Sequence, residues 1–315
     1  MRSSTIYLIF LYTLLCSIAP GQSSPVSTRL PNPRDRNEAD LQRRMNDMRA
    51  LDQKMRPGPR DVPGALAEPK LTSEDRARVV KLRHVAPADI AAYSTLLAQN
   101  RTGIFKLFPD YGCSSKTVVQ LAGECERYVP LSSAFIFRTN AYGDDLYHDI
   151  HFTDRRVSSN SFFSQGIFVA VGNEPIENLD VAHPALRYLV SFQPDTDPKA
   201  AADHARQFSS GLDVDGYRYA DNIEPRENVT YAMRLLAYRL ENNLKPLSPE
   251  TTMNEMMFLS LSKDKRVDVI VLFRILGRDE NDGLTIVWKE LNRNDAAKIK
   301  FAKNQPLRDF RSAPE

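Results

Sequence analysis

The sequence lacks any apolar run long enough to span a bilayer, which takes about 20 residues. Its longest such run is residues 6–16 (IYLIFLYTLLC), preceded by Arg2 and followed by the small residues Ala19 and Gly21. A basic start, a short apolar core and small residues before a cut are typical of a secretory signal peptide. We therefore predict cleavage after residues 1–21, a secreted or periplasmic location, and no transmembrane segment afterwards.

Two alternatives stay open for this first segment. An uncleaved chain would keep it as an N-terminal anchor. Lipid attachment at Cys16 would also hold the protein at a membrane, but Leu15 stands where a lipoprotein signal has a small residue. We expect release rather than anchoring through Cys16.

Cysteine is scarce, with three residues in the chain, and Cys16 would leave with the signal peptide. The two that remain, Cys113 and Cys125, are twelve positions apart in a chain predicted to be exported. An oxidising compartment favours a disulfide between them, worth about 3 kcal/mol on the chain-entropy model. Free thiols, or half of a metal site, are the alternatives.

An excess of charge of either sign is also missing. Lys and Arg number 42 against 40 Asp and Glu, for a net charge of +2. We therefore predict no nucleic-acid partner, because nucleic-acid binding proteins present a strongly basic surface. The short signatures of nucleotide-binding loops, zinc proteases and serine hydrolases are absent as well, so we predict no cofactor.

Aromatic residues are absent between Tyr12 and Tyr93, where seven prolines lie from Pro25 to Pro69 among dense charges. Such a segment cannot bury enough apolar surface to offset the entropy of ordering it. We predict a disordered, flexible linker over residues 22–71. An amphipathic helix over residues 37–55 would interrupt it, with Leu41, Met45, Met48, Leu51 and Met55 at helical spacing. That helix either binds a partner or docks loosely on its own domain.

The rest of the sequence predicts a single α+β domain over residues 72–303, followed by a C-terminal tail over residues 304–315. Its sheet is mainly antiparallel, with a few packed helices. Helices are predicted at residues 73–84, 87–99 and 198–209. The first starts at a capping box formed by Thr72 and Asp75, and Gly211 stops the last.

Short segments rich in β-branched and aromatic residues predict the strands. They are residues 104–108, 134–139, 146–152, 166–171 and 186–192. A hairpin is expected where residues 266–276 and 284–291 flank Asn281-Asp282-Gly283, and Asp215-Gly216 is expected to form a turn. Residues 228–241 fit a helix or a strand, and the Val-Thr-Tyr opening favours the strand.

The densest group of chemically active residues is GDDLYHDIHF, which holds Asp144, Asp145, His148, Asp149 and His151. These are suitable ligands for a divalent metal. On a strand, however, His148 and His151 would point to opposite faces, with Asp149 on the side of His151. We therefore predict no metal site and retain His148, Asp149 and His151 as the catalytic candidates if the protein is an enzyme.

Four blocks of the sequence resemble uncharacterised secreted bacterial proteins: FRTNAYGDDLYHDIHF, SFFSQGIFVAVG, ENVTYAMRLLAYRLE and DVIVLFRILGRDENDGLTIVWKEL. That family has no assigned activity. The resemblance implies a bacterial, exported context and transfers no catalytic residue.

The function expected from these features is that of a non-catalytic exported binding or interaction protein, whose partner is an unknown protein or small-molecule ligand. It rests on aromatic residues on the predicted strands, a minority of which would form a binding surface. They are Phe135, Phe137, Tyr142, Tyr147, Phe152, Phe162, Phe163, Phe168, Tyr217, Tyr219, Tyr231 and Tyr238. The alternative is an exported hydrolase acting on a polymer or cell-envelope component.

Overall fold

The structure is a computed structural model of the chain, which divides into two units, Met1–Glu68 and Pro69–Glu315. Every described residue belongs to the second unit: 72–112, 118–122, 127–130, 132–143, 148–241, 258, 261, 266–303 and 305–309. The predicted signal peptide, Cys16, the linker with its helix at 37–55, and the Cys113–Cys125 disulfide lie outside the described residues. No described helix is both long and apolar enough to cross a membrane.

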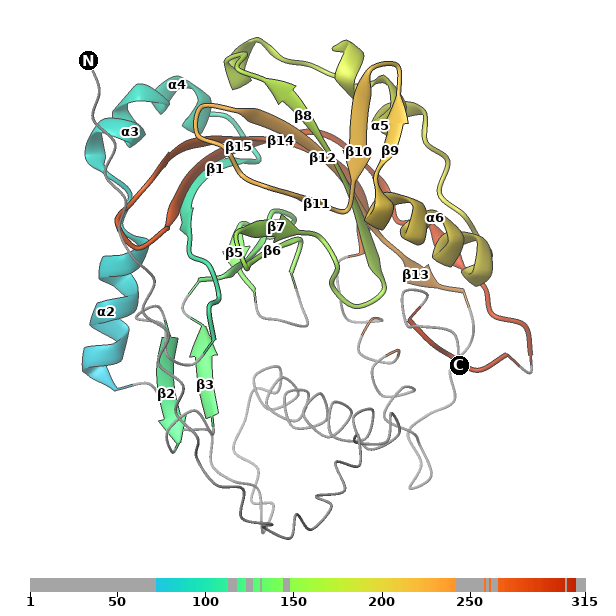
Figure 1. Ribbon diagram of the computed structural model, residues 1–315, viewed down its shortest axis with the longest axis horizontal. Helices are drawn as coiled ribbons and strands as arrows, with labels where there is room; N and C mark the ends of the chain where they lie inside the picture. Colours follow the sequence, from blue (N-terminus) through green and yellow to red (C-terminus); the bar gives the residue numbers. More distant parts are fainter. Residues whose placement is uncertain are drawn as a thin grey trace, which may run out of the picture. The chain divides into compact units, whose positions relative to one another are not determined.

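A seven-stranded antiparallel sheet forms the centre of the second unit (Figure 1). In spatial order its strands are β1 (Thr102–Leu107), β15 (Leu284–Asp295), β14 (Val267–Arg278), β12 (Thr230–Ala237), β8 (Ser164–Gly172), β10 (Tyr217–Ala220) and β9 (Leu212–Val214). The longest pairing joins β14 to β15, and Asp282 adopts a left-handed φ of 61° in the turn between them. The predicted hairpin is confirmed.

Both faces of this sheet are buried, and successive side chains of β12 and β14 point alternately to one face and the other. Met233 and Val271 pack on one face, whereas Leu236 and Leu272 pack on the other. Residues 228–241 are thus mainly a strand and not a helix. The polar Arg234 is buried in the second face, where its guanidinium pairs side-on with Asp268 at 2.9 and 2.6 Å and also donates to the backbone carbonyls of Leu189 and Phe192.

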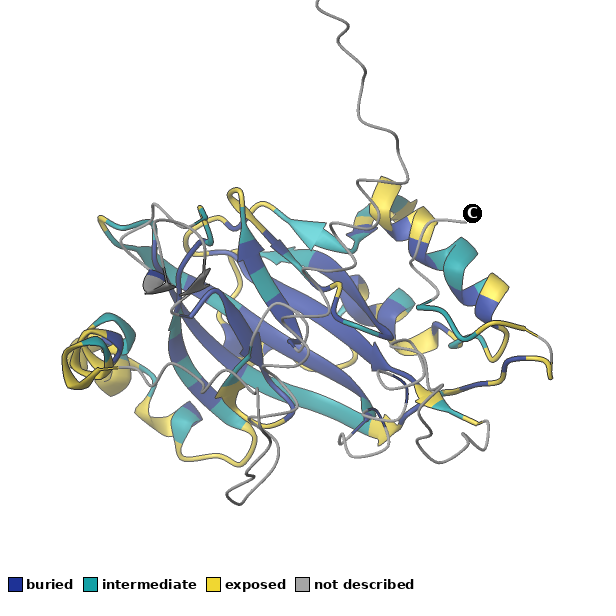
Figure 2. Cartoon of the chain, turned by 90° about the horizontal axis from the view of Figure 1, so that it is seen from below, coloured by how far each residue is buried: buried dark blue, intermediate teal, exposed yellow. Residues whose placement is uncertain are grey.

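A smaller sheet covers one face of the large one. Its strands, in spatial order, are β11 (Asn222–Ile223), β7 (Arg156–Ser158), β6 (Ile150–Thr153), β4 (Ala134–Ile136) and β5 (Ala141–Tyr142). Aromatic rings fill the space between the two sheets: Phe105 stacks on Phe135 at 3.6 Å between ring centroids, and Phe137 meets Trp288 edge-on at 5.2 Å. Figure 2 shows the buried strands of this interior in dark blue.

Helices cover the opposite face. Those that contribute core residues there are α4 (Ser94–Leu97), η1 (Ile176–Asn178), η2 (Pro184–Leu186), α5 (Arg187–Ser191) and α6 (Pro198–Ser210). The helix α3 (Pro87–Ala92) directly precedes α4, and α2 (Ser73–Arg83) lies beside the smaller sheet, where Arg83 stacks over Tyr142 of β5. The capping box of Thr72 and Asp75 is present, and Gly211 ends α6 with φ 84°. The α+β class with a mainly antiparallel sheet is therefore confirmed.

Two short pairs of strands complete the described chain. The first is the hairpin of β2 (Val118–Ala122) and β3 (Arg127–Pro130), and the second is the parallel pair of β13 (Arg239–Leu240) and β16 (Lys298–Ile299).

One predicted element is wrong, and others have different bounds. Residues 186–192 form a helical segment, because Pro184 starts a helical turn and Leu186, Leu189 and Phe192 are buried at a spacing of three. The helix at 87–99 is broken at Tyr93 into α3 and α4. The strand predicted at 134–139 ends at Ile136. In the strand predicted at 146–152, the described residues His148 and Asp149 precede β6, which begins at Ile150.

Candidate functional site

Asp149, one of the three catalytic candidates, is committed to a buried ion pair. Its carboxylate accepts from Arg138 Nε at 2.7 Å and from the Arg138 backbone N–H at 3.1 Å. The two side chains are 0% and 2% exposed. A carboxylate held in this way orients an arginine, so Asp149 is not placed as a general base at a surface cleft.

His148 and His151 lie together, contrary to the prediction that they face opposite ways. Their ring centroids are 5.0 Å apart. The reason is that β6 begins at Ile150, so His148 precedes the strand and escapes its alternation. His148 Nε2 lies 3.2 Å from Asn160 Oδ1, and burial lowers the pKa of His151, an effect that Asp110 opposes.

The structure thus brings the two imidazoles together and directs the Asp149 carboxylate to Arg138. Among the residues that the structure describes, no three His, Cys, Asp or Glu side chains are grouped to hold a metal ion. Asp144 and Asp145 lie outside the described residues.

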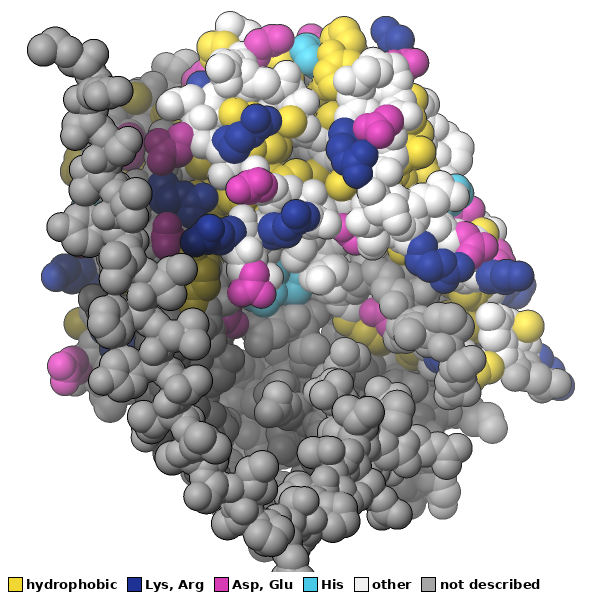
Figure 3. Space-filling view, viewed as in Figure 1, with side chains coloured by type: hydrophobic (Ala, Val, Ile, Leu, Met, Phe, Trp, Pro, Cys, Tyr) yellow, Lys and Arg dark blue, Asp and Glu magenta, His cyan; other side chains and the backbone are white. Residues whose placement is uncertain are grey.

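The strand aromatics form the core and not a surface. Of the twelve named above, Tyr147 lies outside the described residues, and none of the others is exposed. Charges on the face drawn in Figure 3 are mixed, with basic and acidic side chains interspersed over its described part. An aromatic binding face is therefore not what this part of the molecule offers.

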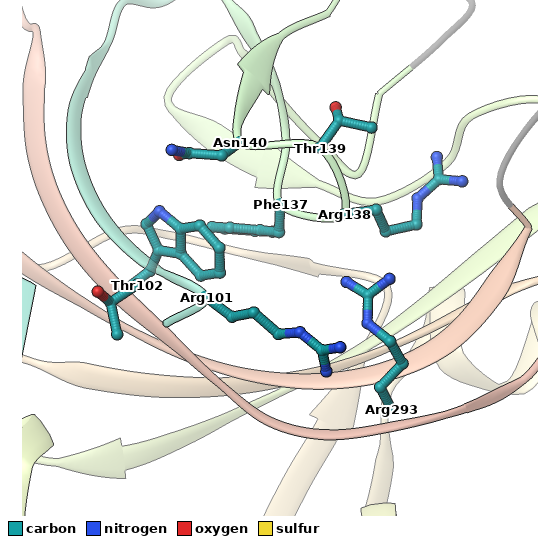
Figure 4. Close-up of a pocket in the computed structure, with 8 residues that line it drawn as sticks. Arg101, Thr102, Phe137, Arg138, Thr139, Asn140 and Arg293 are labelled. Atoms are coloured by element: carbon teal, nitrogen blue, oxygen red, sulfur yellow. The ribbon is translucent and has the colours of Figure 1, made fainter. Parts of the chain in front are cut away.

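A polar cavity of about 430 Å³ opens at one end of the space between the two sheets. We call it the arginine pocket, because three guanidinium groups line it (Figure 4). The lining residues are Arg101, Thr102, Phe137, Arg138, Thr139, Asn140, Trp288 and Arg293. They come from the turn before β1, from residues 137–140 after β4, and from β15.

Glu290 holds two of these arginines in place. It accepts from Arg101 Nη1 at 2.7 Å, and it receives both Nε (2.9 Å) and Nη2 (2.5 Å) of Arg293. The Glu290 side chain is 3% exposed, and its hydrogen bonds raise the pKa of Arg293. Among the described residues, the carboxylate of Glu290 therefore pairs with Arg101 and Arg293, and that of Asp149 pairs with Arg138.

A β-bulge makes this arrangement possible. Val271 pairs with Glu290 and Val269 pairs with Arg293, so the strand β15 carries one extra residue, Leu291, between them. Without it, Glu290 and Arg293 would point to opposite faces, because side chains alternate along a strand. Bulges that re-aim a side chain recur beside functional sites.

Backbone strain also gathers at the pocket. Arg101 and Asn140 have left-handed φ values of 58° and 52°. Asparagine tolerates this conformation, but arginine adopts it at a cost of about 1–3 kcal/mol. The Arg101 carbonyl is fixed there by the N–H of Glu290, at 2.9 Å.

The indole of Trp288 closes the inner wall of the pocket. The residue is 1% exposed, and its Nε1–H has no hydrogen-bond partner among the described residues. Gly103 lies opposite Trp288 across the β1–β15 ladder. A Cβ on Gly103 would lie 2.5 Å from Trp288 Nε1 and 3.0 Å from Asn140 Oδ1, so only glycine fits against the indole here.

Sequence reasoning missed the arginine pocket, because its residues share no local motif. Arg101 and Arg293 are brought together by sheet pairing, and the bulge at Leu291 has no reliable sequence signal. Asn140 offered the only hint, as a residue that favours a left-handed turn. Comparison with protein-family models, curated proteins and solved structures finds no match to this chain.

Proposed function

We propose that this protein binds a small anionic ligand in the arginine pocket. The convergence of Arg101, Arg138 and Arg293 on one open cavity carries the proposal. Arginine presents a planar fork of N–H donors that matches carboxylate and phosphate oxygens, and it stays charged at every physiological pH. The cavity volume of about 430 Å³ is within the range of small-molecule sites.

Two of the pocket's arginines already bind a carboxylate, that of the neighbouring Glu290. Arg293 donates to both oxygens of the Glu290 carboxylate, and Arg101 donates to one of them, Oε1. Arg101 uses one of its five N–H donors for this bond, and its side chain is 59% exposed. This hydrogen bond also fixes the orientation of the other N–H donors of the Arg101 guanidinium, which are available to an entering oxyanion.

Binding is favoured over hydrolysis by the state of the catalytic candidates. Asp149, which a hydrolase would need beside His151, accepts both of its described hydrogen bonds from Arg138. In this proposal Asp149 and Glu290 are positioning residues that orient the arginines. Export of the binding protein is the expectation drawn from residues 1–21.

Titration calorimetry with inorganic phosphate and with small carboxylates tests the proposal. The Arg101→Gln variant is expected to weaken binding about tenfold, as the loss of one charged contact of about 1.4 kcal/mol implies. Arg187→Gln is the matched control: Arg187 is 72% exposed, lies outside the pocket and has a loose 3.8 Å contact with Asp215. Binding should weaken at raised ionic strength, which screens the exposed Arg101.

Two results would contradict the proposal. One is that the unaltered protein binds none of these anions. The other is that Arg101→Gln and Arg187→Gln reduce affinity equally, which would indicate nonspecific attraction to surface charge.

A further inference from the structure

The arginine pocket contains neutral hydrogen-bonding groups as well as guanidinium groups. Trp288 supplies a buried indole donor without a described partner, and Asn140 supplies an amide that both donates and accepts. The hydroxyls of Thr102 and Thr139 line the same cavity. A bare oxyanion would satisfy the cationic donors but would offer no proton to the amide oxygen of Asn140.

The space beside Gly103 is where these neutral groups meet. A Cβ on Gly103 would be 2.5 Å from Trp288 Nε1 and 3.0 Å from Asn140 Oδ1, so both polar atoms lie close to one point, and one oxygen between them can hydrogen-bond to both once the Asn140 side chain shifts. A hydroxyl in that place accepts from the indole N–H and donates to the amide oxygen. Asn140 is exposed on its turn, so its side chain can rotate to admit the group.

We infer that the ligand is a hydroxylated carboxylic acid of the sugar-acid class, an inference that rests on the proposed function. Its carboxylate binds the guanidinium groups, and one of its hydroxyls bridges Trp288 and Asn140. A buried donor left unpaired costs about 1–3 kcal/mol, so the site favours ligands that supply an acceptor there. The cavity of about 430 Å³ has room for a sugar ring.

Four probes separate this inference from the proposed function in titration calorimetry of the purified protein. Glucuronate carries both the carboxylate and the hydroxyls, cyclohexanecarboxylate carries only the carboxylate, glucose carries only the hydroxyls, and inorganic phosphate is a compact oxyanion. Glucuronate is expected to bind at least tenfold more tightly than each of the others.

The other outcomes are informative in different ways. Equal affinity for glucuronate and cyclohexanecarboxylate, or tighter binding of phosphate, overturns the sugar-acid inference and leaves an anion site. Equal affinity for glucose and glucuronate overturns the proposed function, and so does failure of all three anions to bind.

Two variants locate the hydroxyl contact. Trp288→Phe removes the indole N–H, and Asn140→Gly removes the amide while preserving the left-handed backbone. Each is expected to reduce the preference for glucuronate over cyclohexanecarboxylate to less than about threefold. Asn228→Gly is the matched control, because Asn228 is exposed, has φ 59° and lies outside the pocket.

Thermal unfolding establishes that each variant is folded before its ligand preference is measured. If Trp288→Phe does not fold, Asn140→Gly decides alone, because its side chain lies on an exposed turn. A full glucuronate preference retained in folded Asn140→Gly overturns the assignment of this contact.

Discussion

Replacing Asp149 with asparagine separates a structural role for this residue from a catalytic one. The change keeps the shape of the side chain and removes its charge, so the buried Arg138 guanidinium loses its ion pair with Asp149. Both side chains are at most 2% exposed, and two hydrogen bonds of 2.7 and 3.1 Å are affected. Breaking a buried pair by removing one partner costs about 3–5 kcal/mol, since the remaining charge is not solvated.

The loss can be measured as the change in the free energy of unfolding in urea. Asp213→Asn is the control: that carboxylate pairs with Arg218 at 3.1 Å but is 71% exposed, and exposed pairs contribute less than about 1 kcal/mol. Replacing both members of the buried pair, as Arg138→Met with Asp149→Leu, should recover part of the stability lost in Asp149→Asn. A loss below about 1 kcal/mol in Asp149→Asn would refute this reasoning, because it would show that water reaches the pair.

Two of three further predictions concern the surroundings of the pocket, and the third concerns His151. Gly103→Ala places a Cβ 2.5 Å from Trp288 Nε1, and the overpacking is expected to cost about 1–3 kcal/mol, measured by thermal unfolding; an unchanged Tm would contradict it. Glu290→Gln should raise anion affinity about fivefold in calorimetry, because a nearby unit charge is worth ~1 kcal/mol in a solvated site. Weaker binding would show that Glu290 contributes mainly by positioning the arginines. Burial lowers the pKa of His151, so the unfolded chain binds a proton at higher pH than the folded one. Stability should therefore fall as the pH drops through about 6.5, the pKa of histidine in the unfolded chain, and level off below the pKa of the folded state. In urea titrations, His151→Gln should flatten this pH dependence. His84→Gln, at an exposed position, should not.

Elements with strong local chemistry could be predicted from sequence. The capping box of Thr72 and Asp75, and Asp197 with Gly211 at the two ends of α6, define helix ends through hydrogen bonds between near neighbours. The hairpin between β14 and β15 follows from Asn281-Asp282-Gly283, where Asp279 Oδ1 accepts from the N–H groups of Asn281 and Gly283.

Residues 186–192 show where this reasoning fails. A seven-residue apolar segment fits a period of two or of three, so the alternation alone does not distinguish a strand from a helix. In the folded protein this segment packs against the large sheet as a helix. The side chains of Leu186, Leu189 and Phe192 are buried, whereas Val190 is 43% exposed. The prediction for His148 and His151 failed for a similar reason, because whether their side chains face the same side depends on where β6 begins.

The amino-acid sequence by itself therefore determined the α+β class, the helices α2 and α6, and the long strands of the β14–β15 hairpin, because these depend on periodicity and on contacts between near neighbours. Only the tertiary structure decided the arginine pocket. Arg101 and Arg293 meet through the pairing of β1 with β15 and through the bulge at Leu291. Arg138 joins them because the smaller sheet packs on the larger one. Contacts between residues so distant in the chain are set by how whole elements pack, and no local pattern records them.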